Sequence, residues 1–145
     1  MYTVQETASM QQQAKLLKLK YPQEFVAMPP ELLAKMINGY GPEHWSERLR
    51  KIITWIFRHY PLPAAIHDFR YEFSDGIEPT RKAADAEFAV NLHLIWQNRY
   101  GKLRFFNIFA WFDYWKIRMA GSLVKRFSRN AWQESYRRRK ENFYE

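Results

Sequence analysis

Apolar residues recur at helical spacing along most of the chain, and prolines and glycines interrupt them at short intervals. In residues 79–100, Ala84, Phe88, Leu92 and Trp96 follow one another every four positions, which is the spacing of one face of an α-helix. No segment sustains the alternation of apolar and polar residues that is typical of a half-buried β-strand. The pattern predicts an all-α fold.

Turn residues set the expected bounds of the helices. Prolines fit the first turn of a helix, whereas the two glycines and the proline of "NGYGPE", residues 38–43, cannot continue one. The length of 145 residues fits a single domain, with a central antiparallel helix pair and a long aromatic-rich C-terminal helix. Helices are expected at 8–21, 29–37, 44–60, 63–73 and 79–100, and from residue 101 onward with a basic, solvated end.

The composition narrows the class of protein. Hydrophobic residues make up 47% of the chain, and the net charge of +8 favours anionic partners, either lipid headgroups or nucleic acid. The lack of cysteine excludes disulfides and thiolate metal sites. The N-terminus lacks the basic start and apolar run of a signal peptide, and four charged residues interrupt the most apolar stretch, 103–121. We expect a cytoplasmic or virion-associated protein with peripheral membrane contact.

Four polar residues stand out within the predicted helix pair. His67 and Tyr71 are four positions apart and share a helix face, and Asp68 lies about 100° further round. Asp85 falls in the apolar stripe of the next helix, where an unpaired carboxylate would cost several kcal/mol. We expect it to pair with the imidazole of His67 and the hydroxyl of Tyr71. A carboxylate behind a histidine fixes its tautomer and stabilises its charged form, as in a general base.

Asp68 is then left to face a different group. The loop at 38–43 can turn the backbone carbonyls of Gly39, Tyr40 and Gly41 toward one point. A carboxylate together with several carbonyls is a set of hard oxygen ligands, which suits Ca²⁺ better than zinc or copper. A cation beside a histidine base favours the hydrolysis of an ester.

The motifs "HDFRY" at 67–71 and "ADAEF" at 84–88, preceded by "NGYGPE", resemble those of the phospholipase A2 superfamily. They correspond to its His-Asp-x-x-Tyr motif, to the aspartate motif of its second helix and to its glycine-rich calcium loop. The short, cysteine-free layout is most similar to the parvovirus capsid phospholipase domains and to small phage or bacterial proteins. The resemblance covers residues 37–120, which leaves N-terminal helices at 1–36 and a basic segment at 121–145.

The resemblance implies calcium-dependent hydrolysis of the sn-2 ester of glycerophospholipids. His67 would be the base, Asp85 and Tyr71 its supports, and Asp68 a calcium ligand alongside the carbonyls at 39–41. A phospholipid membrane surface would be the partner. Three basic residues of the C-terminal segment are expected to contact that membrane: Lys125, Arg126 and Arg129.

Other interpretations of the same residues stay open. His67 and Asp68 fit an ordinary helix histidine and a solvated aspartate, Asp85 fits a first-turn carboxylate favoured by the helix dipole, and the glycine loop fits a simple helix stop. With His44 and Asp113, the pair also fits a metal-dependent phosphohydrolase of the histidine-aspartate class. The third possibility is a non-enzymatic, basic phage-type protein that binds nucleic acid or belongs to a virion.

Large aromatic residues crowd the region before and after Gly101. More rings fall within residues 96–115 than one helix face can bury. Most of them are expected in the core, and some at a membrane or partner surface.

Overall fold

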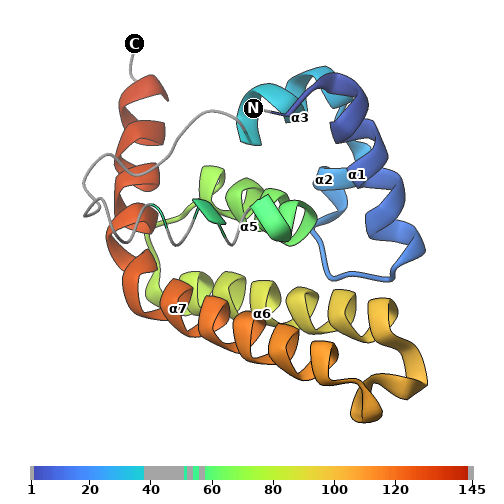
Figure 1. Ribbon diagram of the computed structural model, residues 1–145. Coiled ribbons are helices and arrows are strands. Elements are labelled where there is room, and N and C mark those ends of the chain that lie inside the picture. The colour runs from blue at the N-terminus through green and yellow to red at the C-terminus, as the bar shows by residue number, and fades with distance from the viewer. Residues whose placement is uncertain (1, 38–50, 52–53, 56–57, 144–145) are drawn as a thin grey trace.

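The structure is a computed structural model that describes residues 2–37, 51, 54–55 and 58–143. These residues form helices joined by short connections, with no strand among them, so the predicted all-α fold is confirmed (Figure 1). The predicted helix at 44–60 lies mostly outside the described residues. The elements are α1 Val4–Leu16, α2 Gln23–Ala27, α3 Pro30–Ile37, α5 Pro61–Glu72, α6 Glu78–Tyr100, the 3₁₀ helix η1 Gly101–Phe106 and α7 Ile108–Phe143.

Helix α1 begins and ends earlier than the helix predicted at 8–21. The Thr3 hydroxyl accepts a hydrogen bond from the Glu6 backbone N–H, and the Glu6 carboxylate accepts one from the Thr3 N–H, which together form a capping box. Lys18 has a φ of 50° and lies just beyond the end of the helix. The predicted bounds are wrong because this cap, and not the apolar stripe, decides where α1 starts. The short helix α2 has no counterpart among the predicted helices.

Helices α5 and α6 lie against one another and run in opposite directions (Figure 1). Prolines occupy the first turn of both, as the sequence predicts. Between the helices, the Asp75 carboxylate accepts a hydrogen bond of 2.8 Å from the backbone N–H of Ile77. The guanidinium of Arg70 on α5 donates two hydrogen bonds to Glu87 on α6, at 3.0 and 2.8 Å. These contacts set the two helices in a fixed register.

Helix α7 forms a long hairpin with α6. The connection is η1, so the last helix begins at Ile108, later than predicted. Gly121 permits a close approach, because a Cβ atom there would lie 3.3 Å from that of Ala89 on α6. Further along, α7 turns away from α6 and passes α5, where Trp132 packs edge-on against Tyr71 at 4.9 Å (Figure 1). Small and aliphatic residues of α7 that are buried in this half of the core are Ala110, Ile117, Ala120 and Val124.

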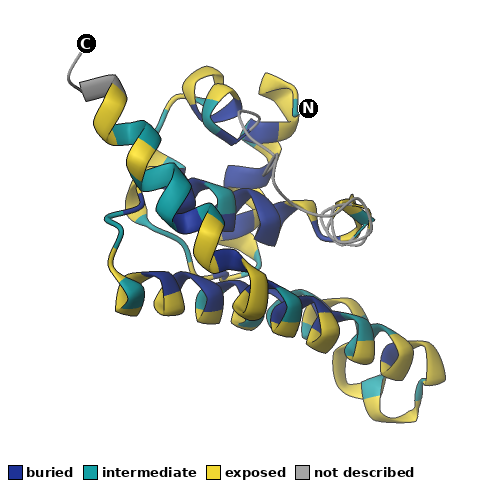
Figure 2. Ribbon diagram, turned by 90° about the vertical axis from the view of Figure 1, so that its left-hand side faces the viewer, coloured by how far each residue is buried: buried dark blue, intermediate teal, exposed yellow. Residues whose placement is uncertain are grey.

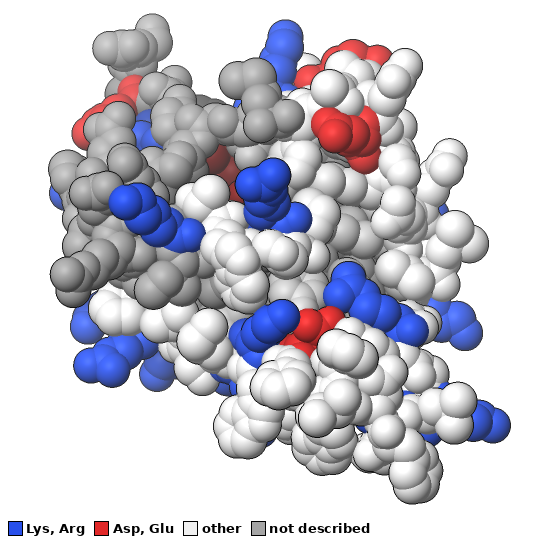
Figure 3. All heavy atoms as spheres, in the orientation of Figure 1, with Lys and Arg blue, Asp and Glu red and all other residues white. Residues whose placement is uncertain are grey.

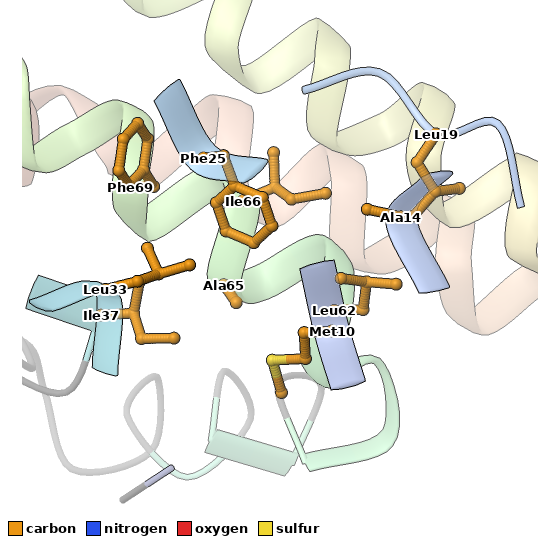
Figure 4. Packing of buried hydrophobic residues seen from close by; sticks show 10 residues of the cluster. All are labelled: Met10, Ala14, Leu19, Phe25, Leu33, Ile37, Leu62, Ala65, Ile66 and Phe69. Atoms are coloured by element: carbon orange, nitrogen blue, oxygen red, sulfur yellow. The ribbon is translucent and has the colours of Figure 1, made fainter. Parts of the chain in front are cut away.

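The main apolar cluster joins the N-terminal helices to α5 (Figure 4). Phe25 of α2 is completely buried there and meets Phe69 of α5 edge-on, with 5.6 Å between ring centroids. The buried amide of Asn91 on α6 fixes the segment after α1: it accepts from the N–H of Lys20 and donates to its carbonyl, both at 2.7 Å. The N-terminal helices therefore cover one side of α5, while α6 and α7 cover another.

Buried positions line the inner faces of the helices and exposed positions the outer faces (Figure 2). The end of the hairpin formed by α6 and α7 is an exception, because most of its side chains are exposed. Across the described ranges, no helix combines the length and the apolar character needed to cross a bilayer.

Candidate active site

His67, Tyr71 and Asp85 meet in the interior of the protein. Nε2 of His67 lies 3.1 Å from Oδ1 of Asp85, and the Tyr71 hydroxyl donates a hydrogen bond of 2.7 Å to the same oxygen. The exposed fractions of His67 and Asp85 are only 6% and 1%. The interpretation of Asp85 as a solvated first-turn carboxylate is therefore wrong, because Ser128 of α7 covers this part of α6 and bonds to it.

The contact with Asp85 fixes the tautomer of His67. A carboxylate oxygen can only accept, so Nε2 carries the proton and Nδ1 of the neutral ring keeps its lone pair. The ring lies against Tyr71, with 4.2 Å between ring centroids, and against Phe88 at 5.0 Å. These contacts hold the imidazole in place, and Nδ1 is the atom left to take up a proton.

Arg81 and Ser128 complete the hydrogen bonding of Asp85. Nη1 of Arg81 donates to Oδ2 of Asp85 at 2.5 Å, and the Ser128 hydroxyl donates to the same oxygen at 2.8 Å. Other guanidinium nitrogens of Arg81 donate to Glu78 at 2.9 and 2.6 Å. Each carboxylate oxygen of Asp85 thus accepts two hydrogen bonds, and the residue links α5, α6 and α7.

The network determines which of its groups are charged. Burial alone would raise the pKa of Asp85, but the hydrogen bonds from His67 and Tyr71 outweigh it and hold the pKa below its ordinary value. Burial and the nearby charge of Asp85 raise the pKa of Tyr71, so its hydroxyl stays protonated at neutral pH. The hydrogen bonds to Glu78 and the charge of Asp85 raise the pKa of Arg81. Asp85 is therefore an ionised carboxylate in a buried site.

Asp68 lies on α5 next to His67 and is not among the residues that form hydrogen bonds with Asp85. Burial, together with the negative charge of Glu72, raises the pKa of Asp68 to about 8. A bound cation would relieve the cost of two carboxylates held close together in a partly buried place. If Ca²⁺ bound here, Asp68 would supply one oxygen ligand, and Glu72 is a second candidate. The other predicted ligands, Gly39, Tyr40 and Gly41, lie outside the described residues.

Asp113, which the phosphohydrolase interpretation requires, does not lie with His67 and Asp68. Asp113 belongs to another cluster, where it forms an ion pair with Arg99 at 3.2 Å. Along α7 it is roughly 22 Å from Ser128, at a rise of 1.5 Å per residue. His44 lies outside the described residues. Within the part of the chain that the structure describes, no three His, Asp or Glu side chains form a group that could hold a metal ion.

The predicted membrane-contact residues Lys125, Arg126 and Arg129 are exposed on α7. Ser128 lies between them in the sequence but points inward to Asp85. The described part of the basic segment is helical to Phe143, and its Ser128 belongs to the buried network around Asp85.

Arg81 and Ser128 are absent from the residues predicted for the site. The sequence contains a signal for Arg81, because an arginine four positions before an aspartate on a helix is well placed to pair with it. No local signal points to Ser128, whose contact with Asp85 spans 43 residues. Its role depends on how α7 passes α5 and α6.

The arrangement of His67 and Asp85 suits general-base chemistry. A histidine whose Nε2–H is held by an ionised carboxylate can accept a proton at Nδ1 and remain stabilised as the imidazolium. Such a group can activate water or a hydroxyl for attack on an electrophile. Known proteins offer no closer guide, because the chain matches no family model, no curated protein and no solved structure.

Proposed function

We propose that the protein is a calcium-dependent, phospholipase A2-like hydrolase that cleaves the sn-2 ester of glycerophospholipids. The observation that carries the proposal is one shared oxygen: Oδ1 of Asp85 accepts from both His67 and Tyr71 in a buried site. The order and spacing of "HDFRY" and "ADAEF" in the sequence support the same activity.

His67 acts as the general base. Its Nδ1 takes a proton from a water molecule, and the oxygen of that water attacks the carbonyl carbon of the ester. The imidazolium that forms is stabilised by Asp85, 3.1 Å from Nε2. When the tetrahedral intermediate collapses, the ring returns the proton to the leaving alkoxide. The products are a fatty acid and a lysophospholipid.

Asp85 and Tyr71 are positioning residues. The Tyr71 hydroxyl and His67 share Oδ1 of Asp85, while Arg81 and Ser128 hold Oδ2, so the carboxylate cannot rotate without losing several hydrogen bonds. The orientation of the imidazole is therefore set before substrate binds, which lowers the cost of reaching the reactive geometry.

Asp68 is the side chain that would hold the calcium ion. It is adjacent to His67 in the chain, and the hydrogen bonds of Asp85 and Arg81 go to other residues. A bound Ca²⁺ supplies positive charge that stabilises the oxyanion of the reacting ester. The backbone carbonyls of Gly39, Tyr40 and Gly41 are the further ligands that the resemblance implies.

The proposal is tested by fatty-acid release from vesicles of phosphatidylcholine and phosphatidylglycerol, with calcium or with a chelator. Wild type should release fatty acid only with calcium, and His67→Gln and Asp68→Asn should each lose at least about 100-fold in rate. His93→Gln is the matched control, because His93 lies elsewhere on α6 and stacks on Trp96 at 5.3 Å. Its rate should equal that of wild type. No release from folded wild-type protein would overturn the proposal.

A second candidate is a non-enzymatic protein that binds nucleic acid. The observation that favours it is that α7 remains helical as far as Phe143 and carries all the basic residues of the segment at 121–145. Salt-sensitive binding to DNA that is unchanged in His67→Gln, without any lipid hydrolysis, would favour this candidate.

A further inference from the structure

The end of the hairpin formed by α6, η1 and α7, here called the hairpin tip and comprising residues 101–119, exposes a large apolar surface. Phe106 is 91% exposed and Phe109 is 71% exposed. An isolated folded chain rarely exposes so many large apolar side chains together, and such patches mark interaction sites. The exposed apolar residues of the tip are Leu103, Phe105, Phe106, Ile108, Phe109, Trp111, Phe112, Trp115 and Met119.

This exposure follows from the way α7 packs. Ala110 and Ile117 lie in the buried cluster that α7 shares with α6. Ile108, Phe112, Trp115 and Met119 follow one another at helical spacing on a different face of α7, and all four are exposed. None of the residues of η1 is buried. The described chain therefore has no element that covers this surface, and the hairpin projects beyond the rest of the molecule in Figure 1.

Basic residues surround the apolar surface. Residues 99–119 contain five Lys and Arg residues and a single acidic residue, Asp113. The Asp113 carboxylate is already paired, at 3.2 Å with Arg99 and at 3.3 Å with Lys116. Figure 3 shows lysine and arginine side chains beside the uncharged lower end of the molecule. The five basic residues are Arg99, Lys102, Arg104, Lys116 and Arg118.

We infer that the hairpin tip inserts into the headgroup region of an anionic phospholipid bilayer. Aromatic rings favour this boundary, where the apolar part of the ring is buried and polar groups stay in water. The surrounding cations match anionic headgroups, whereas a second copy packed on the same surface would bring like charges together. A projecting end also suits insertion better than a concave groove would.

The same exposed face continues toward the predicted membrane-contact residues. From Met119, helical spacing leads to Arg126 and then to Arg129, both of which are exposed. The tip would therefore provide the apolar anchor, with basic residues further along α7 as supporting contacts. The inference rests on the proposed function in so far as a lipid hydrolase must reach its substrate in a bilayer, but binding itself needs no hydrolysis.

Binding is measured by co-sedimentation of the His67→Gln protein with vesicles of phosphatidylcholine alone or mixed equally with phosphatidylglycerol. We expect binding to the mixed vesicles that weakens at high salt. When Phe106→Ser and Phe109→Ser are introduced together into this protein, binding should weaken at least about tenfold. When Lys102→Gln and Arg118→Gln are introduced together instead, binding should weaken on the mixed vesicles only. Two pairs serve as matched controls that should bind unchanged: Leu16→Ser with Leu32→Ser, and Lys15→Gln with Lys35→Gln.

Equal binding by the Phe106 and Phe109 variant and its control would overturn the inference. The inference would also be overturned if wild type does not bind vesicles but forms a dimer that the same two substitutions dissociate. The hairpin tip would then contact another copy of the chain. A second test uses proteins that keep His67, and it separates this inference from the proposed function. It compares the hydrolysis of vesicles with that of a dispersed short-chain phospholipid. If the Phe106→Ser and Phe109→Ser variant loses hydrolysis of vesicles but keeps hydrolysis of the short-chain lipid, the inferred role of the hairpin tip is supported. If wild type hydrolyses neither substrate, the proposed function is overturned and the binding test remains valid.

Discussion

Asp85 and His67 are 18 residues apart in the sequence, yet Oδ1 of the carboxylate lies 3.1 Å from Nε2 of the ring and both side chains are buried. The same carboxylate also forms an ion pair with Arg81, so Asp85 contacts both the candidate base His67 and a positively charged guanidinium. A buried charge is tolerated only where its hydrogen bonds are satisfied, and Asp85 meets this condition through helices α5, α6 and α7. Stability and the proposed chemistry therefore depend on the same carboxylate.

Asp85→Asn should lower the free energy of unfolding by about 1.5–3 kcal/mol, because Nη1 of the buried Arg81 loses its carboxylate partner and the guanidinium keeps only its ion pair with Glu78. Urea denaturation followed by circular dichroism gives the value. Asp113→Asn is the matched control: Asp113 pairs with Arg99, whose side chain is 48% exposed, so the loss should be about 1 kcal/mol or less. Equal losses in the two variants would show that the network around Asp85 contributes no more than a surface ion pair.

Tyr71→Phe removes one hydrogen bond to Asp85 and leaves the ring in place against Trp132. We expect the free energy of unfolding to fall by about 1–1.5 kcal/mol, the usual net value of one buried hydrogen bond. Under the proposed function, the rate of fatty-acid release should fall less than in His67→Gln, because His67 keeps its contact with Asp85. A Tyr71→Phe variant as inactive as His67→Gln would contradict a positioning role.

Asp68 should make the protein less stable as the pH rises. Burial and Glu72 raise its pKa to about 8 in the folded state, whereas the value in an unfolded chain is about 4. The folded state therefore binds more protons than the unfolded state between about pH 4 and pH 8, and stability falls across this window. Asp68→Asn removes the effect, so the variant should gain stability over wild type from acid to alkaline pH.

Melting temperatures at about pH 5 and pH 9, in chelator, measure this difference directly. Asp75→Asn, in the turn between α5 and α6, controls for the general effect of removing a carboxylate. A gap between Asp68→Asn and wild type that does not change with pH would contradict the raised pKa.

Asn91→Leu should lower the free energy of unfolding by about 1–3 kcal/mol, because it leaves the N–H and carbonyl of Lys20 without the amide that bonds to both. Chemical denaturation gives the loss. Asn98→Leu is the matched control on the same helix, since its amide bonds only to the carbonyl of Leu94 at an exposed position. Similar losses in both variants would mean that the link between α6 and the N-terminal segment adds no stability.

Local sequence was sufficient to predict most of the described helices and part of the site. Helical spacing alone places His67 and Tyr71 on one face, and proline positions indicate where α5 and α6 begin. The bounds of α1 were less well predicted, because the capping box at Thr3 lies outside the apolar stripe. An aspartate in an apolar stripe needs hydrogen-bond partners, and the contacts predicted for Asp85 with His67 and Tyr71 are present.

Tertiary structure decided the rest. Only the path of α7 past α5 and α6 brings the hydroxyl of Ser128 to Asp85 and packs Trp132 on Tyr71. The same path leaves exposed six aromatic residues at the end of the hairpin that were expected mostly in the core: Phe105, Phe106, Phe109, Trp111, Phe112 and Trp115. The physical reason is that helical periodicity is fixed within one or two turns of chain, whereas the choice of neighbour depends on the combined packing of segments far apart in sequence.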